Sequence, residues 1–327
     1  MEIERKWKVF VTRKLPQKAL DWLSEKCELE VNPENRILKK EEIIEGVKGK
    51  DGLLCLLTDK IDAEIIDSVD LKMIANYAVG FDNVDIKAAT QRKIPVSNTP
   101  GVLTDATAEL AWALLFSVAR RAVEGDKFCR ADKFRGWDPM LMLGVDLKGK
   151  TLGVVGAGRI GTAFALKSRG FEMNVIYTKR SENEILEKEL GAKRVEMDEL
   201  LKSSDFISIH LPLNSKTRHI IGEWELKLMR PTSILINTSR GPVVDEKALV
   251  KALKEEWIRG AGLDVYENEP VIEPGLLDLD NVVLLPHLGS ATEETRTKMA
   301  MMAAENLITG LEGEVPLNCV NAEVFKR

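Results

Sequence analysis

The sequence predicts an α/β protein with two domains, in which a doubly wound parallel sheet is inserted into a smaller α/β domain. Two observations predict this fold. Short apolar runs alternate with helical stretches in two separate parts of the chain, as in parallel sheets covered by helices. A glycine-rich turn, GAGRIG, follows the first apolar run of the second part. One long helical segment separates the two parts.

The composition is typical of a soluble globular protein. With 327 residues, 44% of them apolar and 30% charged, the chain is long enough for two domains with separate cores. The net charge is −5, and no long run of either sign occurs, so we expect neither a nucleic-acid nor a membrane surface. The four cysteines lack metal-ligand or CxxC spacing, so we expect reduced thiols, no metal site and a cytoplasmic location.

The sequence predicts neither a signal peptide nor a transmembrane helix. The N-terminal stretch MEIERKWKVF is charged and lacks the apolar core of a signal peptide. No apolar run approaches the roughly 18 residues that a transmembrane helix requires.

The first part of the chain begins with a short strand and a helical stretch. The strand is expected at KVFVT, and the helix at 15–23. Further apolar runs then follow at GLLCLL (52–57) and LKMIANYAVG (71–80), and the stretch IPVSNTPG (94–101) leads into the long helix.

The long helix between the two parts is expected in LTDATAELAWALLFSVARRA. Thr104 suits the N-cap position and Asp105 the first turn. Large apolar residues then recur at helical spacing, at Leu110, Leu114, Leu115 and Val118. The following segment, 123–147, is predicted to be less regular because it contains Gly136, Trp137 and Pro139.

The second part contains six expected strands, enough for a complete doubly wound domain over residues 99–289. The strands are KTLGVVG, NVIYT, DFISIHLP, SILINTS, AGLDV and NVVLLPH. The last helical segment, TEETRTKMAMMAAENLITGL, is predicted to return to the first domain and enlarge its core. The first domain then comprises residues 1–98 and 290–327.

The glycine-rich turn fits the G-x-G-x-x-G pattern of a Rossmann-type dinucleotide-binding unit. The first glycine makes a tight turn, the second allows the backbone to approach a pyrophosphate, and the third allows close packing of helix on strand. The helix N-terminus then faces the phosphates. The alternative is a glycine-rich turn without a ligand. The expected cofactor contacts are Gly156, Ala157, Gly158, Arg159, Ile160 and Gly161.

The second strand of this unit lacks the usual acid. An Asp or Glu at its end would bind the adenosine ribose hydroxyls, but the chain has Thr178, Lys179, Arg180 and Ser181 there. A carboxylate would repel a 2′-phosphate, whereas Lys and Arg with flanking hydroxyls would bind it. We therefore expect NADP(H) to be preferred and NAD(H) to remain possible. The alternative is a solvated basic turn.

Three polar residues follow strands of the second part, at the edge where open α/β sheets bind ligands. They are Arg240, Glu269 and His287. An arginine can bind a carboxylate and polarise a ketone, an imidazolium can protonate an alkoxide, and a glutamate can orient the imidazole and favour its protonated form. Each residue alone could instead be an ordinary solvated loop residue. Of the other histidines, His210 could line the adenine side, and His219 lies in a polar connection.

Four motifs resemble the signatures of the D-isomer-specific 2-hydroxyacid dehydrogenases: GAGRIG, INTSRGPVVDEKAL, AGLDVYENEP and LPHLGSAT. The likeness to this family extends over the whole chain. The resemblance implies that Arg240 binds substrate, that His287 is the proton donor and that Glu269 is its partner. It implies that the N–H groups of Val79 and Gly80 hold the substrate carboxylate. It also implies contacts with the nicotinamide half of the cofactor at Thr104, Thr238, Ser239 and Asp264.

The resemblance also implies a homodimer and a class of substrate. In this family the segment after the long helix crosses to the other subunit, so Trp137 could close the neighbour's active site. The stretches YAVGFDNVD and NTPGVLTDATAELAWALL are most similar to those of glyoxylate and hydroxypyruvate reductases. Asn76 stands where phosphoglycerate dehydrogenases have arginine, and Val79 where phosphite dehydrogenases have lysine, which disfavours both activities.

The expected reaction is therefore the NADPH-dependent reduction of glyoxylate and hydroxypyruvate to glycolate and D-glycerate. Two alternatives stay open. The first is a broad D-2-hydroxyacid dehydrogenase for a larger 2-oxo acid. The second is a non-catalytic NAD(P)-sensing corepressor, which would bind the nucleotide without turning over any 2-oxo acid.

Overall fold

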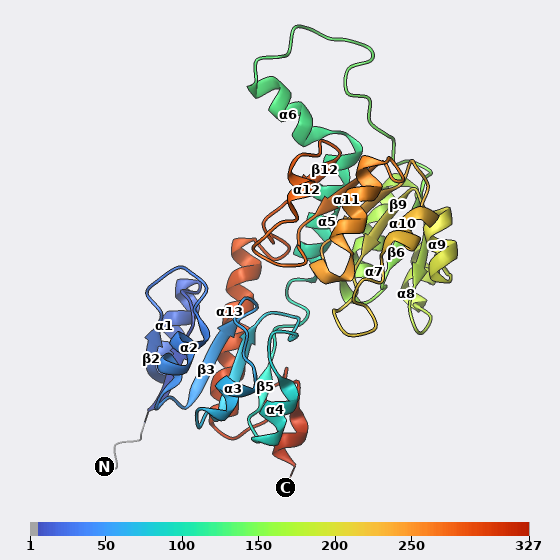
Figure 1. Cartoon of the computed structure of the whole chain (residues 1–327). Coiled ribbons are helices and arrows are strands. Elements are labelled where there is room, and N and C mark those ends of the chain that lie inside the picture. Colours follow the sequence, from blue (N-terminus) through green and yellow to red (C-terminus); the bar gives the residue numbers. More distant parts are fainter. Residues whose placement is uncertain (1–5, 327) are drawn as a thin grey trace. The chain divides into compact units, whose positions relative to one another are not determined.

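The computed structural model describes residues 6–326, which form two compact units (Figure 1). Unit 1 comprises residues up to Leu103 and again from Ala291, and unit 2 comprises Thr104–Ser290. Unit 2 is thus inserted into unit 1. The expected boundaries, 98/99 and 289/290, lie five residues and one residue before these divisions. The predicted two-domain α/β fold with an inserted Rossmann-type domain is confirmed.

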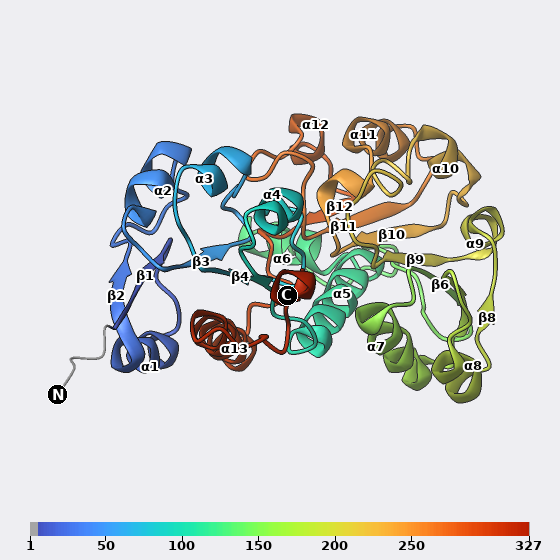
Figure 2. The ribbon, with the colours of Figure 1, turned by 90° about the horizontal axis from the view of Figure 1, so that it is seen from below.

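Unit 1 is a five-stranded parallel sheet in the order β2-β1-β3-β4-β5, with helices on both faces. Figure 2 shows α1 and α13 on one face, with α2 and α3 on the other. The strands are β1 (Trp7–Val11), β2 (Cys27–Val31), β3 (Gly52–Leu56), β4 (Met73–Tyr77) and β5 (Val96–Ser97). The helices are α1 (Gln17–Lys26), α2 (Lys40–Val47), α3 (Ala63–Asp67), α4 (Ile86–Gln91), α13 (Glu293–Leu311) and the 3-10 helix η3 (Ala322–Phe325).

Helix α13 packs against β3, β4 and α1, so the last long helix belongs to unit 1. The hydroxyl of Tyr77, at the end of β4, donates to the carbonyl of Arg296 in α13. Strand β2 was not predicted from the sequence. It is an edge strand with the alternating sequence CELEV, whose Glu28 and Glu30 are exposed, so it lacks the continuous apolar run of a central strand.

Unit 2 is a seven-stranded parallel sheet in the order β12-β11-β10-β9-β6-β7-β8. Its strands are β6 (Thr151–Val155), β7 (Asn174–Thr178), β8 (Lys193–Arg194), β9 (Phe206–Ile209), β10 (Ile234–Asn237), β11 (Gly260–Leu263) and β12 (Val282–Leu284). Its helices are α5 (Thr104–Ala119), α6 (Ala122–Arg130), α7 (Arg159–Lys167), α8 (Glu184–Leu190), α9 (Met197–Ser203), α10 (Glu223–Leu228), α11 (Glu246–Lys254) and α12 (Pro274–Leu277), with the 3-10 helices η1 (Ser168–Phe171) and η2 (Gly241–Val243).

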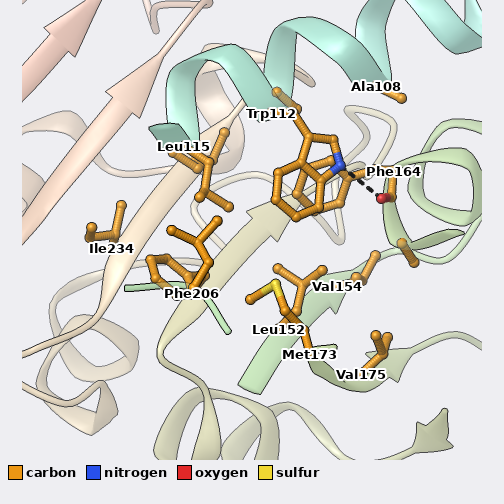
Figure 3. Packing of buried hydrophobic residues seen from close by; sticks show 14 of the residues in the cluster. Ala108, Trp112, Leu115, Leu152, Val154, Phe164, Met173, Val175, Phe206 and Ile234 are labelled. Atoms are coloured by element: carbon orange, nitrogen blue, oxygen red, sulfur yellow. Dashed lines mark hydrogen bonds between the residues drawn. The ribbon is translucent and has the colours of Figure 1, made fainter. Parts of the chain in front are cut away.

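Apolar cores lie on both faces of this sheet. The face covered by α5 and α7 is built around Trp112 and Phe164, whose rings stack with centroids 5.0 Å apart (Figure 3). The Trp112 indole N–H donates to the carbonyl of Phe164 at 3.0 Å, which satisfies a polar atom inside the core. The opposite face is covered by α9, α10 and α11 (Figure 2). Burial on both faces explains the continuous apolar strands of this unit.

Three local expectations differ from the structure. Helix α5 begins at Thr104, so this residue lies in the first turn instead of capping it. Residues 122–130 form helix α6, although the segment was expected to be irregular; the helix is short, contains Gly125 and buries none of its residues. The two-residue strand β8 adds a seventh strand to the expected six. Within residues 6–326, no helix has the length and apolar character needed to cross a membrane.

Candidate active site

The glycine-rich turn between β6 and α7 has the geometry that each of its glycines was expected to provide. Gly156 has φ +94°, and the N–H groups of Gly156 and Ala157 donate to the carbonyl of Thr178 at the end of β7. A Cβ on Gly158 would meet no atom within 4 Å, so this backbone borders open space. A Cβ on Gly161 would lie 2.3 Å from the Gly156 carbonyl oxygen, so the helix packs closely there.

The residues present fit a dinucleotide. Helix α7 begins immediately after Gly158, so the N–H groups of Arg159 and Ile160 in its first turn lack helical acceptors and can bind a pyrophosphate. The hydroxyl of Thr238, beyond β10, is buried and has no hydrogen-bond partner. A buried polar atom of this kind usually has a bound water or ligand as its partner, and a nicotinamide carboxamide would supply one.

The basic turn after β7 is exposed and held from two sides. Lys179, Arg180 and Ser181 are exposed at the surface. The Arg194 guanidinium donates to the Lys179 carbonyl at 3.3 Å, and the Asn183 amide donates to the carbonyl of Ala157 at 3.1 Å. Arg194 of β8 is thus bonded to the basic turn, and Asn183, the N-cap of the following helix α8, is bonded to the glycine-rich turn.

His287 and Glu269 form a hydrogen-bonded pair. The imidazole Nδ1 lies 2.8 Å from Glu269 Oε2, and the other carboxylate oxygen accepts the N–H of Tyr266 at 3.0 Å. Burial alone would raise the pKa of Glu269, but the His287 hydrogen bond and charge, the Tyr266 N–H and the charge of Arg240 together hold that pKa below its usual value. Glu269 is therefore ionised at neutral pH. Because Nδ1 faces the carboxylate, Nε2 is the nitrogen left for a reacting group.

The turn that carries His287 has an unusual backbone, and Asp264 fixes it. His287 has φ +56°, in the left-handed region that side-chain-bearing residues seldom adopt. The fully buried carboxylate of Asp264 accepts the N–H groups of Leu288 and Gly289 at 2.6 and 2.8 Å. Burial raises the pKa of Asp264 to about 6, against the opposing effects of these N–H groups and of the His287 charge. Asp264 thus holds the backbone immediately after the imidazole.

Arg240 lies beyond β10 in a turn that is bonded to the strand end. The side-chain amide of Asn237 donates to the Arg240 carbonyl at 3.1 Å, and its oxygen accepts from the Ser239 N–H and hydroxyl. The charge of Arg240 acts on Glu269. The structure therefore brings the three expected catalytic residues to the same edge of the unit 2 sheet.

Sequence reasoning missed two residues of this edge. A Cβ on Gly241 would lie 1.8 Å from the carbonyl carbon of Tyr266, so only glycine allows the Arg240 turn to contact the backbone before Glu269. Glu246, at the start of α11, is 4% exposed, and its carboxylate accepts the Glu267 N–H at 2.7 Å. The motif RGPVVDE signals both positions, but an acid in a first helical turn is ordinarily solvated.

The remaining predicted residues belong to other segments of the chain. Val79 and Gly80 belong to unit 1, where Asn98 donates to the Val79 carbonyl and Asn76 to that of Gly80. Thr104 opens α5. Trp137 is 85% exposed in the segment after α6.

The two other histidines have separate partners. Burial lowers the pKa of His210 to about 3, so its ring is neutral; Nε2 lies 2.9 Å from the hydroxyl of Ser208. His219 pairs with Glu267 at 2.7 Å, and Glu267 also binds Arg218. The pairing of His219 therefore lies outside the Glu269–His287 pair.

Comparison with known proteins identifies the family. The model of the D-isomer specific 2-hydroxyacid dehydrogenase NAD-binding domain matches residues 112–289. The chain belongs to the D-isomer-specific 2-hydroxyacid dehydrogenase family, which confirms the resemblance seen in the motifs.

Individual relatives carry narrower names. The chain is 52% identical over 323 residues to a glyoxylate reductase of Thermococcus litoralis, covering 97% of this chain and 98% of that protein. A crystal structure of a glyoxylate reductase from Paecilomyes thermophila is 36% identical, with TM-score 0.86 and coverage of 96% and 98%. An NADPH-dependent glyoxylate/hydroxypyruvate reductase from Sinorhizobium meliloti, in complex with NADP and malonate, is 30% identical with TM-score 0.86, covering 98% and 99%.

The contact at Gly241 generates a stability prediction. Gly241→Ala should lower the free energy of unfolding by about 1–3 kcal/mol and lower the dehydrogenase activity, because the added methyl group must displace the Tyr266 backbone. Gly125→Ala is the control: a Cβ there meets nothing within 4 Å inside α6, so alanine should stabilise the helix by about 0.5–1 kcal/mol. Chemical denaturation measures both effects, and wild-type stability of Gly241→Ala would contradict the close contact.

Proposed function

We propose that this protein reduces glyoxylate and hydroxypyruvate to glycolate and D-glycerate, with NADPH as the preferred reductant and His287 as the proton donor. The observation that carries the proposal is the 2.8 Å pair between His287 Nδ1 and ionised Glu269, on the sheet edge that also bears Arg240. The substrate class follows the glyoxylate reductases to which the whole chain is similar.

The side chains have distinct roles in this reaction. A nicotinamide cofactor held at the glycine-rich turn would supply the hydride for the carbonyl carbon. Arg240 binds the substrate carboxylate and polarises the carbonyl oxygen, and the N–H groups of Val79 and Gly80 contribute to holding the carboxylate. His287 Nε2 delivers a proton to the oxygen as negative charge develops there, while Glu269 holds the ring and stabilises its protonated form. In the oxidative direction, neutral His287 takes the proton back.

The cofactor preference rests on charge at the basic turn. No acid stands at positions 178–181 at the end of β7, and exposed Lys179 and Arg180 present cations where the 2′-phosphate of NADPH would lie. The guanidinium can form paired hydrogen bonds with phosphate. The structure of the Sinorhizobium meliloti relative with NADP supports the same reading. NAD(H) remains usable because the glycine-rich turn does not distinguish the two dinucleotides.

The segment after α6 supports a homodimer. It exposes several large apolar side chains within a short stretch, as an interface segment does before its partner is bound. They are Phe134 (54%), Trp137 (85%), Met140 (72%) and Leu143 (51%). We propose that this segment lies across a second copy of the chain and that Trp137 limits the size of that copy's substrate.

We also propose a cytoplasmic location, because the four free thiols suit a reducing compartment.

The proton-transfer pair is tested by pH–rate profiles. In Glu269→Gln the charge that favours the imidazolium is absent, so reduction should lose rate at a lower pH than in wild type, and oxidation should begin at a lower pH. His287→Ala should slow both directions about a hundredfold or more without weakening NADPH binding. Glu267→Gln is the matched control, since Glu267 pairs with His219 and Arg218 instead. Overlaid profiles of Glu269→Gln and wild type would remove Glu269 from the mechanism.

The cofactor preference is tested by Arg180→Ala. Loss of a charge-assisted bond of about 1.5–3 kcal/mol should raise the KM for NADPH about ten- to hundredfold. The KM for NADH should change little, because NADH lacks the 2′-phosphate. Equal effects on the two cofactors would instead mean that the basic turn is a solvated surface.

The substrate range is tested by Trp137→Ala. The wild type should have a higher kcat/KM for glyoxylate and hydroxypyruvate than for branched 2-oxo acids, and the variant should narrow that difference about tenfold. Trp224→Ala, at a tryptophan that is 56% exposed on α10, is the control. A wild type that reduces a branched 2-oxo acid as well as glyoxylate would favour the broader dehydrogenase, and nucleotide binding without any turnover would favour the corepressor.

A further inference from the structure

Glu246 is a buried carboxylate that takes no direct part in the proposed chemistry. It is the first residue of α11 and is 4% exposed, although an acid at a helix start can remain in water at no cost. Burial raises the pKa of Glu246, and the charges of Glu267 and Glu273 add to this effect. A carboxylate held in such surroundings needs a compensating set of hydrogen bonds.

That stabilisation comes from the loop that carries Glu269. The Glu246 carboxylate accepts the backbone N–H of Glu267 at 2.7 Å. The backbone of Glu273, on the other side of Glu269 in the chain, lowers the pKa of the same carboxylate. The carboxylate therefore anchors the loop at the N-terminus of α11, two residues before Glu269.

The loop has a second fixed point, next to the first. The backbone of Tyr266 and Glu267 is in contact with Gly241 at the Arg240 turn. The N–H of Tyr266 in turn donates to Glu269 Oε1, so the orientation of the Glu269 carboxylate depends on where this backbone lies. The other carboxylate oxygen, Oε2, is bonded to His287.

We propose that Glu246 is a positioning residue for the reaction: it holds the 266–273 loop so that Glu269 can orient and charge-stabilise His287. The inference rests on the proposed function, because it requires Glu269 and His287 to act as a proton-transfer pair. Glu246 itself contacts neither the imidazole nor the reacting atoms.

The first variant is Glu246→Ala, assayed as the full-length protein with glyoxylate and NADPH. Misplacing Glu269 should lower kcat about ten- to hundredfold and move the high-pH loss of reduction toward that of Glu269→Gln, with the KM for NADPH within about twofold of wild type. In Glu246→Gln the amide keeps an acceptor oxygen for the Glu267 N–H but loses the charge that strengthens this bond, so kcat and the profile should lie between those of Glu246→Ala and wild type. If Glu246→Ala does not fold, Glu246→Gln decides alone.

The matched control is Asp245→Ala, which removes the N-cap of the same helix. Asp245 Oδ1 accepts the Ala248 N–H at 3.1 Å, so this variant should lower the thermal midpoint while leaving the pH profile unchanged. A lower thermal midpoint together with an unchanged pH–rate profile in both Glu246 variants would show that Glu246 is merely structural and would overturn the inference.

A double-mutant cycle separates this inference from the proposed function. If Glu246 acts through Glu269, then Glu246→Ala should cost little further kcat in a Glu269→Gln background. Full, additive losses would overturn the inference while leaving the proton-transfer pair intact. A Glu269→Gln profile that overlays wild type would overturn the proposed function, and Glu246 would then have no pair to position.

Discussion

The hydrogen bond between His287 and Glu269 depends on two loops that follow different strands, so both loops must be fixed for the pair to form. The His287 turn is fixed by the Asp264 carboxylate, which binds the two N–H groups after the imidazole. The Glu269 loop is fixed by Glu246 and by its contact with Gly241. Both loops are therefore held by side-chain carboxylates that accept backbone N–H groups, an arrangement that fixes the orientation of a polar site.

Two acids of this edge have pKa values that are shifted in opposite directions. Glu269 is ionised because His287 and Arg240 are its neighbours, whereas burial raises the pKa of Asp264 to about 6. Groups that titrate in different ranges although they lie on one sheet edge are common where proton transfer occurs. A change in the charge of His287 affects both acids, so the pH dependence of the enzyme belongs to the group and not to a single residue.

Much of this fold and site could be predicted from the sequence because the signals are local. The roles of Gly156, Gly158 and Gly161 follow from their spacing, and the expected catalytic residues follow strand ends that meet at one edge. Glu246 could not be recognised, because the backbone N–H that it binds belongs to Glu267, 21 residues away in the sequence. Helix α6 was missed since it buries no apolar face, and β8 since it has only two residues. Gly241 and Glu246, which were also missed, are fixed by tertiary contacts and not by periodicity.

The exposure of the basic turn has a consequence for ionic strength. Lys179, Arg180 and Arg194 face solvent, so at 0.15 M salt, where the Debye length is about 8 Å, counterions compete with any phosphate bound there. The Glu269 and His287 side chains are only 28% and 26% exposed and are in direct contact, so mobile ions screen them much less. In the proposed reaction, rising salt should therefore weaken the capture of the dinucleotide long before it disturbs proton transfer at His287, so the two parts of the proposed site would respond differently to the same solution.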